Sequence, residues 1–447
     1  MVKKLKTPAR IFAFLSVGLS GLYFYKAKSL VGTALMLPKA LGAALAPFVG
    51  VMGAVGAALG LLAQAPLAVI AGILGASASA RHVKQVTAPH GGFEKAFGPD
   101  WRHKVMHNLT PEQRKGMLKQ RWTWWMPSRP GARASEPRWE RDVLYRTVPA
   151  TAGAKATQLL CDVWQPPEGV EPSALAVVYI HGSAWHVGDK DFLTRPFFRH
   201  LAAQGHVVMD IAYRLCPEAD VFDMVDDVKH AIAWIKANAD EYGVNPERIV
   251  LGGGSAGGHL ALLAGYAPVH PRLTPDDLKD VDTSARGVFA HYGAVDTRAV
   301  LEHASHVLPD KPIRGLKVVL SALEAILPMG DSARGMDWST FSAATMIGNL
   351  MGGTPEEVPD VYELASPITH ASPGCPPTLL LQGEHDAIMP AYSTRKLHRK
   401  LVEAGVPSIY VEFPQTNHGF DLIIPQTSPS AQAATYDVDR FLALMVN

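Results

Sequence analysis

The stretch Val250-Leu251-Gly252-Gly253-Gly254-Ser255-Ala256-Gly257-Gly258-His259-Leu260 decides the fold of this chain. It begins in an apolar run, passes through a glycine-rich corner centred on one serine, and continues into a segment rich in alanine and leucine. This order predicts a strand, a sharp turn and a helix. The corner fits the pattern G-x-S-x-G, in which the serine sits on a strained turn with its hydroxyl exposed. The alternative is an ordinary glycine-rich turn between a strand and a helix.

A serine on such a turn is a candidate nucleophile. Glycines on both sides are needed because bulkier side chains would collide with the strand or the helix. The backbone N–H of Ala256, at the start of the new helix, can point at a developing oxyanion. We therefore interpret Ser255 as the nucleophile of a candidate active site.

Apolar runs on both sides of this stretch alternate with helical patterns. The expected strands are 143–148, 158–164, 176–180, 207–212, 248–252, 288–292, 378–381 and 408–413. Helical spacing is clearest in 222–242, and the last helix is expected over 431–445. This alternation predicts a mostly parallel central sheet with helices on both faces. In sheets of this kind, the active-site residues lie at the carboxyl ends of the strands.

Small residues follow the expected strand 176–180, in the segment His181-Gly182-Ser183-Ala184-Trp185. Because side chains there are small, the backbone N–H groups of Gly182 and Ser183 can face inward as oxyanion donors. The alternative is a plain turn at the end of a strand.

An acid and a histidine follow the last two expected strands. Asp386 comes just after 378–381, with Glu384 as a rival acid and His385 interpreted as a loop residue. His418 comes just after 408–413 and can act as the general base and then the general acid. The chain order Ser255, Asp386, His418 is the order in which this kind of fold carries its triad.

Together these segments resemble a known family. The blocks are His181-Gly182-Ser183-Ala184-Trp185, Tyr213-Arg214-Leu215-Cys216-Pro217-Glu218, Gly253-Gly254-Ser255-Ala256-Gly257-Gly258, and Asp386 with His418-Gly419-Phe420-Asp421. From about residue 140 to 445 the chain resembles the α/β-hydrolase fold and, within it, the hormone-sensitive-lipase-like carboxylesterases. The resemblance implies a carboxylic ester hydrolase with the triad Ser255, Asp386 and His418. It also implies an oxyanion hole formed by Gly182, Ser183 and Ala256, with no metal and no cofactor.

Two departures from that family leave alternatives open. Ser183 and Ala184 stand where the family has glycines, and Gly254 stands where it usually has an acidic residue. Both features lean towards prenylcysteine methylesterases and arylformamidases, and the segment 223–227 resembles the methylesterases. Amide, formamide or methyl-ester hydrolysis is therefore the main alternative activity. A ligand-binding protein that has lost catalysis is the alternative from another class.

An insertion of about 80 residues, 295–375, interrupts the expected strand order. Its apolar content predicts a helical cap over the strand ends, suited to an acyl or isoprenoid substrate. Most of these apolar residues could equally pack the cap onto the sheet. Trp185 is a candidate pocket residue, or only a packing residue.

The front of the chain, 1–80, predicts a membrane anchor. No charged residue occurs in 40–80, which is long enough for two helices near 41–62 and 64–80. A first apolar segment, 11–25, lies in the interface or crosses alone. Lys39 and Arg81 flank the uncharged run, which favours a hairpin with both ends, and the catalytic domain, on the cytoplasmic side. A cleaved signal peptide and a buried helical hairpin are the alternatives.

Composition bounds the remaining possibilities. The 447 residues carry a net charge of +1, which gives no global signal for nucleic acid, and the three cysteines show no metal spacing. We expect a basic connector at 81–139 and a catalytic domain at 140–447. Trp122, Trp124 and Trp125 in the connector suit either a headgroup layer or packing against the next domain. The expected partners are a small-molecule or lipid ester and a membrane, and the sequence does not predict the oligomeric state.

Overall fold

An eight-stranded sheet forms the centre of the computed structural model, which describes residues 2–26, 35–126, 136–150, 156–191, 193–307 and 342–447. Its strand order is β1-β2-β4-β3-β5-β6-β7-β8. The pairs β1–β2 and β2–β4 are antiparallel and the other five are parallel, so β2 runs opposite to all the other strands. The strands are β1 (Arg138–Val148), β2 (Thr157–Gln165), β3 (Ala176–Ile180), β4 (Val207–Ile211), β5 (Ile249–Gly254), β6 (Gly287–His291), β7 (Thr378–Gly383) and β8 (Ser408–Phe413).

The inner strands form because helices cover both of their faces. Every residue of β3, β4, β5, β6 and β7 is buried, and most of them are apolar, as expected of a parallel sheet covered on two sides. Each lies within a few residues of the range that the sequence predicts. The predicted α/β-hydrolase fold, with a mostly parallel sheet, is therefore confirmed.

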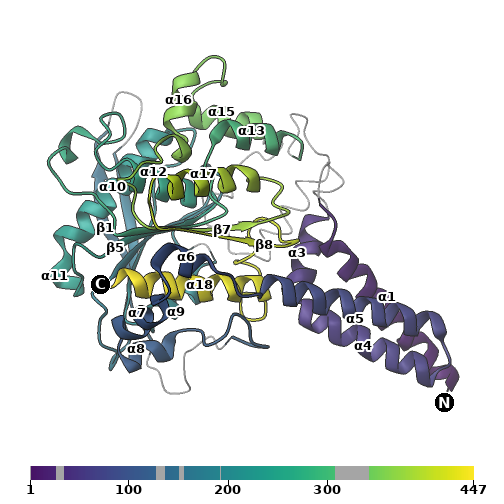
Figure 1. The fold of residues 1–447 in the computed structure, drawn as a ribbon. Coiled ribbons are helices and arrows are strands. Elements are labelled where there is room, and N and C mark those ends of the chain that lie inside the picture. The colour runs from purple at the N-terminus through teal and green to yellow at the C-terminus, as the bar shows by residue number, and fades with distance from the viewer. Residues whose placement is uncertain (1, 27–34, 127–135, 151–155, 192, 308–341) are drawn as a thin grey trace.

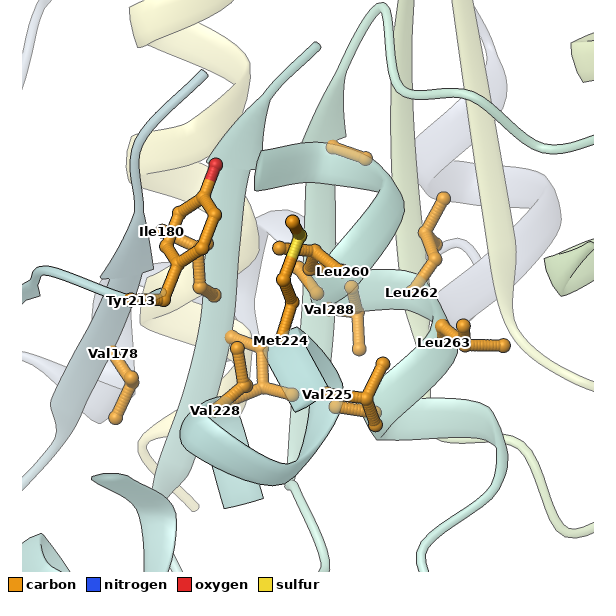
Figure 2. Packing of buried hydrophobic residues seen from close by; sticks show 14 of the residues in the cluster. Val178, Ile180, Tyr213, Met224, Val225, Val228, Leu260, Leu262, Leu263 and Val288 are labelled. Atoms are coloured by element: carbon orange, nitrogen blue, oxygen red, sulfur yellow. The ribbon is translucent and has the colours of Figure 1, made fainter. Parts of the chain in front are cut away.

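Helices on one face pack on the sheet through large apolar side chains. These helices are α10 (Val221–Ala237), α11 (Ala239–Tyr242), α12 (Ala256–Tyr266) and α17 (Ala391–Glu403), with the short η1 (Asp276–Leu278) and η4 (Pro367–Thr369) nearby. Figure 2 shows the centre of this core, where Val225 and Val228 of α10 and Leu260 and Leu263 of α12 lie beside strand residues such as Val178.

The opposite face is covered by the last helix and by residues that precede the sheet in the sequence. The helices there are α6 (Gly92–Phe97), α7 (Trp101–Asn108), α8 (Pro111–Gly116), α9 (Arg195–Ala202) and α18 (Pro429–Met445), as Figure 1 shows. Phe93, Trp101 and Val105 belong to the same buried cluster as Phe441 of α18. Part of the expected connector 81–139 thus packs as one layer of the sheet domain, while the exact domain boundaries stay a prediction.

Three further helices lie beyond α12 and α17 on the same side of the sheet (Figure 1): α13 (Thr297–Ser305), α15 (Ala343–Met351) and α16 (Pro359–Leu364). They fall within the expected cap insertion 295–375. The apolar cap residues predicted within 308–341 lie outside the described residues.

A helical bundle projects from one end of the sheet domain (Figure 1). It contains α1 (Val2–Tyr23), α3 (Met36–Ala44), α4 (Ala46–Leu62) and α5 (Pro66–Val86). The first apolar segment, 11–25, belongs mainly to α1, which packs along both α4 and α5. Among the described helices, α5 alone is long and apolar enough to span a membrane by length and composition. The pair α3 and α4 passes the same test only when joined, across a bend of 80°.

Candidate active site

The sharp turn between β5 and α12 places Ser255 at the carboxyl end of the sheet. Its φ of 55° and ψ of −120° are strained values for a residue with a side chain. The neighbouring glycines are required by close approach, because a Cβ on Gly257 would lie 1.9 Å from the carbonyl oxygen of Ile180. The local sequence therefore forms the tight elbow that it predicts.

The three predicted triad residues meet at this turn. Ser255 Oγ lies 2.9 Å from His418 Nε2, and Asp386 Oδ2 lies 2.8 Å from His418 Nδ1. Because a carboxylate only accepts hydrogen bonds, Nδ1–H of the histidine donates to Asp386. Nε2 is then free to accept the proton of the serine hydroxyl.

The carboxylate of Asp386 is fixed from several sides. Its Oδ1 accepts hydrogen bonds from the backbone N–H groups of Ile388 and Met389 at 2.9 and 2.8 Å, and Gln382 donates to Oδ2 at 3.1 Å. The rival acid, Glu384, instead accepts a hydrogen bond from the backbone of Gln415. Among the two candidate acids, geometry therefore favours Asp386.

The segment after β3 adopts an unusual backbone. Ser183, Ala184 and Trp185 have φ values of 87°, 58° and 64°, in the left-handed region that favours glycine. The ring of His181 lies 2.8 Å from the carbonyl oxygen of Gly182. Since the C=O and N–H of a trans peptide point in opposite directions, the N–H of Ser183 is directed away from that ring. Gly182 and Ser183 line the same cavity as Ser255, which places their backbone groups near the proposed reaction.

Two elements brace this segment. Tyr213 donates a hydrogen bond to the carbonyl oxygen of His181 at 3.0 Å, and the two rings stack at 4.4 Å. Burial lowers the pKa of His181 to about 4, so the ring is neutral near pH 7. Arg214 pairs with Asp227 and Asp223 on α10, which explains the carboxylates of 223–227 as structural partners.

The third predicted oxyanion donor, Ala256, is the first residue of α12 and is fully buried. The first N–H groups of a helix have no partner within it. Ala256 N–H is therefore available beside Ser255.

A mainly apolar cavity of about 280 Å³ opens at Ser255. Besides the triad and oxyanion residues, its large apolar wall residues are Trp185, Val187, Tyr292, Met346, Ile388, Met389 and Leu422. Trp185 is both a wall residue and a packing residue, since it is fully buried and its Nε1–H donates to His259 Nδ1 at 3.2 Å. Burial lowers the pKa of His259 to about 4, and its Nε2 lies 2.7 Å from the carbonyl oxygen of Ala365.

Sequence reasoning missed Tyr292, which supports the histidine loop. Its ring lies 4.4 Å from that of His418, and its hydroxyl donates to Asp421. Burial, followed by the charge of Asp421, raises the pKa of Tyr292 well above its ordinary value. The residue stands at the end of an ordinary apolar strand, so no local signal marked it.

Within the described ranges, no group of three or more His, Cys, Asp or Glu side chains is placed to hold a metal ion. The three cysteines are buried and unbridged.

The sheet order, the serine elbow and the neighbouring histidine and acid define the molecule as an α/β-hydrolase. Comparison with known proteins agrees, because the sequence profile of the BD-FAE family matches residues 161–321 and 327–401, more than half of the chain. The chain belongs to the BD-FAE family. The resemblance to esterases of this fold is thereby confirmed.

Curated relatives from Mycobacterium tuberculosis have esterase names. The "Probable carboxylic ester hydrolase LipM" is 32% identical over 63% of this chain and 57% of its own length. Esterase LipQ is 28% identical over 82% of this chain and 76% of its own length. For esterase LipC the identity is 30%, over 66% of this chain and 63% of its own length. The chain thus spans less than two thirds of LipM and of LipC.

A solved structure with a similar fold is Thermogutta terrifontis esterase 2. The form phosphoramylated by tabun shares 22% identity with this chain, covers 69% of it and 95% of its own length, and has a TM-score of 0.49. Its butyrate-bound form shares 24% identity, covers 69% of this chain and 93% of its own length, and has a TM-score of 0.48.

Proposed function

We propose that this protein is a carboxylic ester hydrolase that works through a Ser-His-Asp triad and an acyl-enzyme intermediate. The observation that carries the proposal is the hydrogen-bonded chain from Ser255 through His418 to Asp386 at the floor of an apolar cavity. The esterase names of the curated relatives support the same reaction class.

Each residue has a definite task in this reaction. His418 accepts the proton of Ser255 as the oxygen attacks the ester carbonyl, and Asp386 stabilises the imidazolium that forms. The N–H groups of Gly182, Ser183 and Ala256 stabilise the negative charge on the carbonyl oxygen. His418 then protonates the leaving alcohol and later activates the water that releases the acid.

The substrate we propose is an ester with a hydrophobic or lipid-like acyl group. Support comes from the cavity wall, where Trp185, Met346 and Leu422 offer apolar surface and few competing polar groups. Burial of apolar substrate surface against such a wall contributes about 25 cal/mol per Å².

Labelling and turnover together test the proposal. A fluorophosphonate probe should label the full chain, and Ser255→Ala should abolish both labelling and hydrolysis of aryl esters graded by acyl length. Ser305→Ala, an exposed serine on α13, is the matched control and should behave as the parent. Turnover that survives Ser255→Ala would refute the mechanism. Faster cleavage of matched amides or formamides would instead favour the alternative activity, and ligand binding without turnover would favour a non-catalytic role.

We also propose that the helical bundle anchors the protein in a membrane. Its interior contains small residues such as Ala9, Ala13 and Ala68, whereas large apolar side chains face outward. The outward side chains that are more than half exposed include Ile11, Leu15, Leu61, Leu62, Leu67, Ile70, Ile73 and Leu74. Small contacts inside and large apolar groups outside are typical of helices that associate in lipid.

Aromatic residues near the domain end of the bundle support this attachment. Trp124 and Trp125 are more than half exposed, and the Trp124 ring lies 6.1 Å from that of Phe48 on α4. Such rings suit the headgroup layer. Because Lys39, Arg81 and Lys84 lie at this end, we propose that the catalytic domain faces the cytoplasm.

Fractionation tests the attachment and protease protection tests the side. The full chain should stay in the membrane pellet after an alkaline carbonate wash, and the catalytic domain should be digested only when the inner face is exposed. A chain that is released by carbonate and is monodisperse without detergent would refute the anchor.

A further inference from the structure

The helical bundle contacts the loop that carries Asp386, through α3. Lys39 of α3 is 2% exposed, and its Nζ lies 2.8 Å from Nδ1 of His385 and donates to the carbonyl oxygen of Tyr25 at 2.7 Å. His385 immediately precedes Asp386 in the sequence. A buried amino group is costly unless it is hydrogen-bonded, and Lys39 meets this need by linking the backbone of Tyr25 to the ring of His385.

Both ring nitrogens of His385 face polar partners. Nδ1 lies beside the amino group of Lys39, and Nε2 lies 4.0 Å from a carboxylate oxygen of Glu384. Burial, assisted by the positive charge of Lys39, lowers the pKa of His385 to about 4, which keeps the ring neutral.

Apolar packing adds to the same contact. Met36, one turn before Lys39, packs against the buried pair Ala387 and Val307. Ala387 directly follows Asp386, and Val307 follows α13. One short helix of the bundle therefore touches residues on both sides of the predicted catalytic acid.

The loop that carries His418 is held by α5 of the same bundle. His82 Nδ1 lies 3.3 Å from the side-chain oxygen of Gln415, and the amide of Gln415 donates to Gln85 at 3.0 Å. Gln415 has a φ of 56°, a conformation that a residue with a side chain adopts only when its surroundings impose it.

Two hydrogen bonds donated by backbone N–H groups join the two catalytic loops to each other. The N–H of His385 donates to the carbonyl oxygen of Thr416 at 2.9 Å, and the N–H of Gln415 donates to Glu384 at 2.9 Å. A shift of α3 or α5 would therefore move the acid loop and the histidine loop together, relative to Ser255 on the sheet.

We propose that Lys39 is a positioning residue of the active site, and that the helical bundle sets the geometry of the triad through the Lys39–His385 contact. This inference rests on the proposed hydrolase function. Lys39 is absent from the cavity wall, so its loss should alter the alignment of the reacting groups and not the binding of substrate. A misplacement of about 1 Å can cost roughly 100-fold in rate.

Steady-state kinetics on the full chain in detergent, with one short soluble aryl ester, test this inference. The variants are Lys39→Met, His385→Leu, the double variant and Lys84→Met. Lys84 is exposed on α5 at the same end of the bundle, so its variant removes an equivalent charge away from the catalytic loops. Melting temperature and recovery in the membrane fraction are measured for every variant.

The inference predicts that Lys39→Met lowers kcat about 10- to 100-fold with KM within twofold of the parent. His385→Leu should have a similar effect, and the double variant should be no worse than the poorer single variant, because both remove one contact. Lys84→Met should match the parent. The inference would be overturned if Lys39→Met kept the kcat of the parent. It would also be overturned if the fold-loss of kcat in the double variant equalled the product of the two single losses.

Two further outcomes are possible. If Lys39→Met is not recovered in a folded state, the test rests on His385→Leu, and an unchanged kcat in that variant overturns the inference. If the parent chain does not hydrolyse the ester, or if hydrolysis persists in Ser255→Ala, the proposed function itself fails. The positioning role of Lys39 then fails with it.

Discussion

The sheet domain and the helical bundle differ in where their large apolar side chains lie. In the sheet domain the largest apolar side chains are inside, as around Val228 and Leu263 in Figure 2. In the bundle the inside is mainly alanine, glycine and serine, with Tyr23 and Val49 as larger exceptions, while many leucine, isoleucine and phenylalanine side chains face outward. A core of large side chains is stabilised by removal of apolar area from water. A core of small side chains allows close helix contact, which matters where the surroundings are themselves apolar.

The predicted active site lies where these two regions meet. Ser255 and the strands that support it belong to the sheet domain, while the loops of Asp386 and His418 also contact the bundle. The contrast therefore predicts different consequences for substitutions in each region.

The largest expected effect comes from the buried acid at this junction. Asp386→Asn should lower kcat about 10⁴-fold, because the amide favours the wrong tautomer of His418. Glu384→Gln should cost far less, since Glu384 accepts a hydrogen bond from the backbone of Gln415 while Asp386 lies beside His418. Turnover of one aryl ester measures both. A larger loss in Glu384→Gln than in Asp386→Asn would assign the acid to the other loop residue.

Substitutions of one buried and one exposed leucine compare packing in the sheet domain with packing in the bundle. Leu263→Ala, at a fully buried position of the sheet domain, should lower the free energy of unfolding by about 2–5 kcal/mol. Leu61→Ala, 68% exposed on α4, should change it by less than about 0.5 kcal/mol. Chemical denaturation in detergent measures both variants. Equal losses would show that Leu61 lies in a protein core and would contradict the outward orientation.

A matched pair of glycines tests the small interior of the bundle. A Cβ on Gly72 would lie 2.5 Å from the carbonyl oxygen of Gly53, whereas one on Gly18 would meet nothing within 4 Å. Gly72→Val should therefore destabilise the bundle by about 1–3 kcal/mol through overpacking. Gly18→Val should be neutral or stabilise slightly, by less than about 1 kcal/mol, because valine has a higher helix propensity than glycine and meets no neighbour there. Thermal unfolding in detergent measures the difference, and similar behaviour of the two variants would contradict the observed helix contacts.

Much of the fold and of the candidate site follows from local sequence signals. The strands are predicted well because runs such as 176–180 are apolar throughout and end at small or polar residues. Ser255, Asp386 and His418 are predicted because each follows its own strand in the required order. These signals need no knowledge of which distant segments touch.

Other features depend on contacts that no local pattern records. His385 is predicted as a loop residue and lies in a turn, but its contact with Lys39, 346 positions away, leaves no mark on the local sequence. Lys39 itself looked like a charge that flanks an apolar run. The packing of α6 to α8 was hidden by their basic surface, since only Phe93, Trp101 and a few other apolar residues face the sheet.

The smallest expected effect concerns the strained segment after β3. Ser183 has a φ of 87°, which costs a residue with a Cβ about 1–2 kcal/mol relative to an ordinary conformation. Ser183→Gly relieves the backbone strain in the folded state. Glycine also raises the conformational entropy of the unfolded chain, which favours unfolding, so the two effects on stability partly cancel. We expect a gain of less than about 1 kcal/mol in unfolding free energy. We also expect nearly parental kcat, because the oxyanion donor proposed at this position is a backbone group. Denaturation and turnover of the purified variant measure the two quantities. A loss of stability would mean that the Ser183 side chain contributes packing that outweighs its strain.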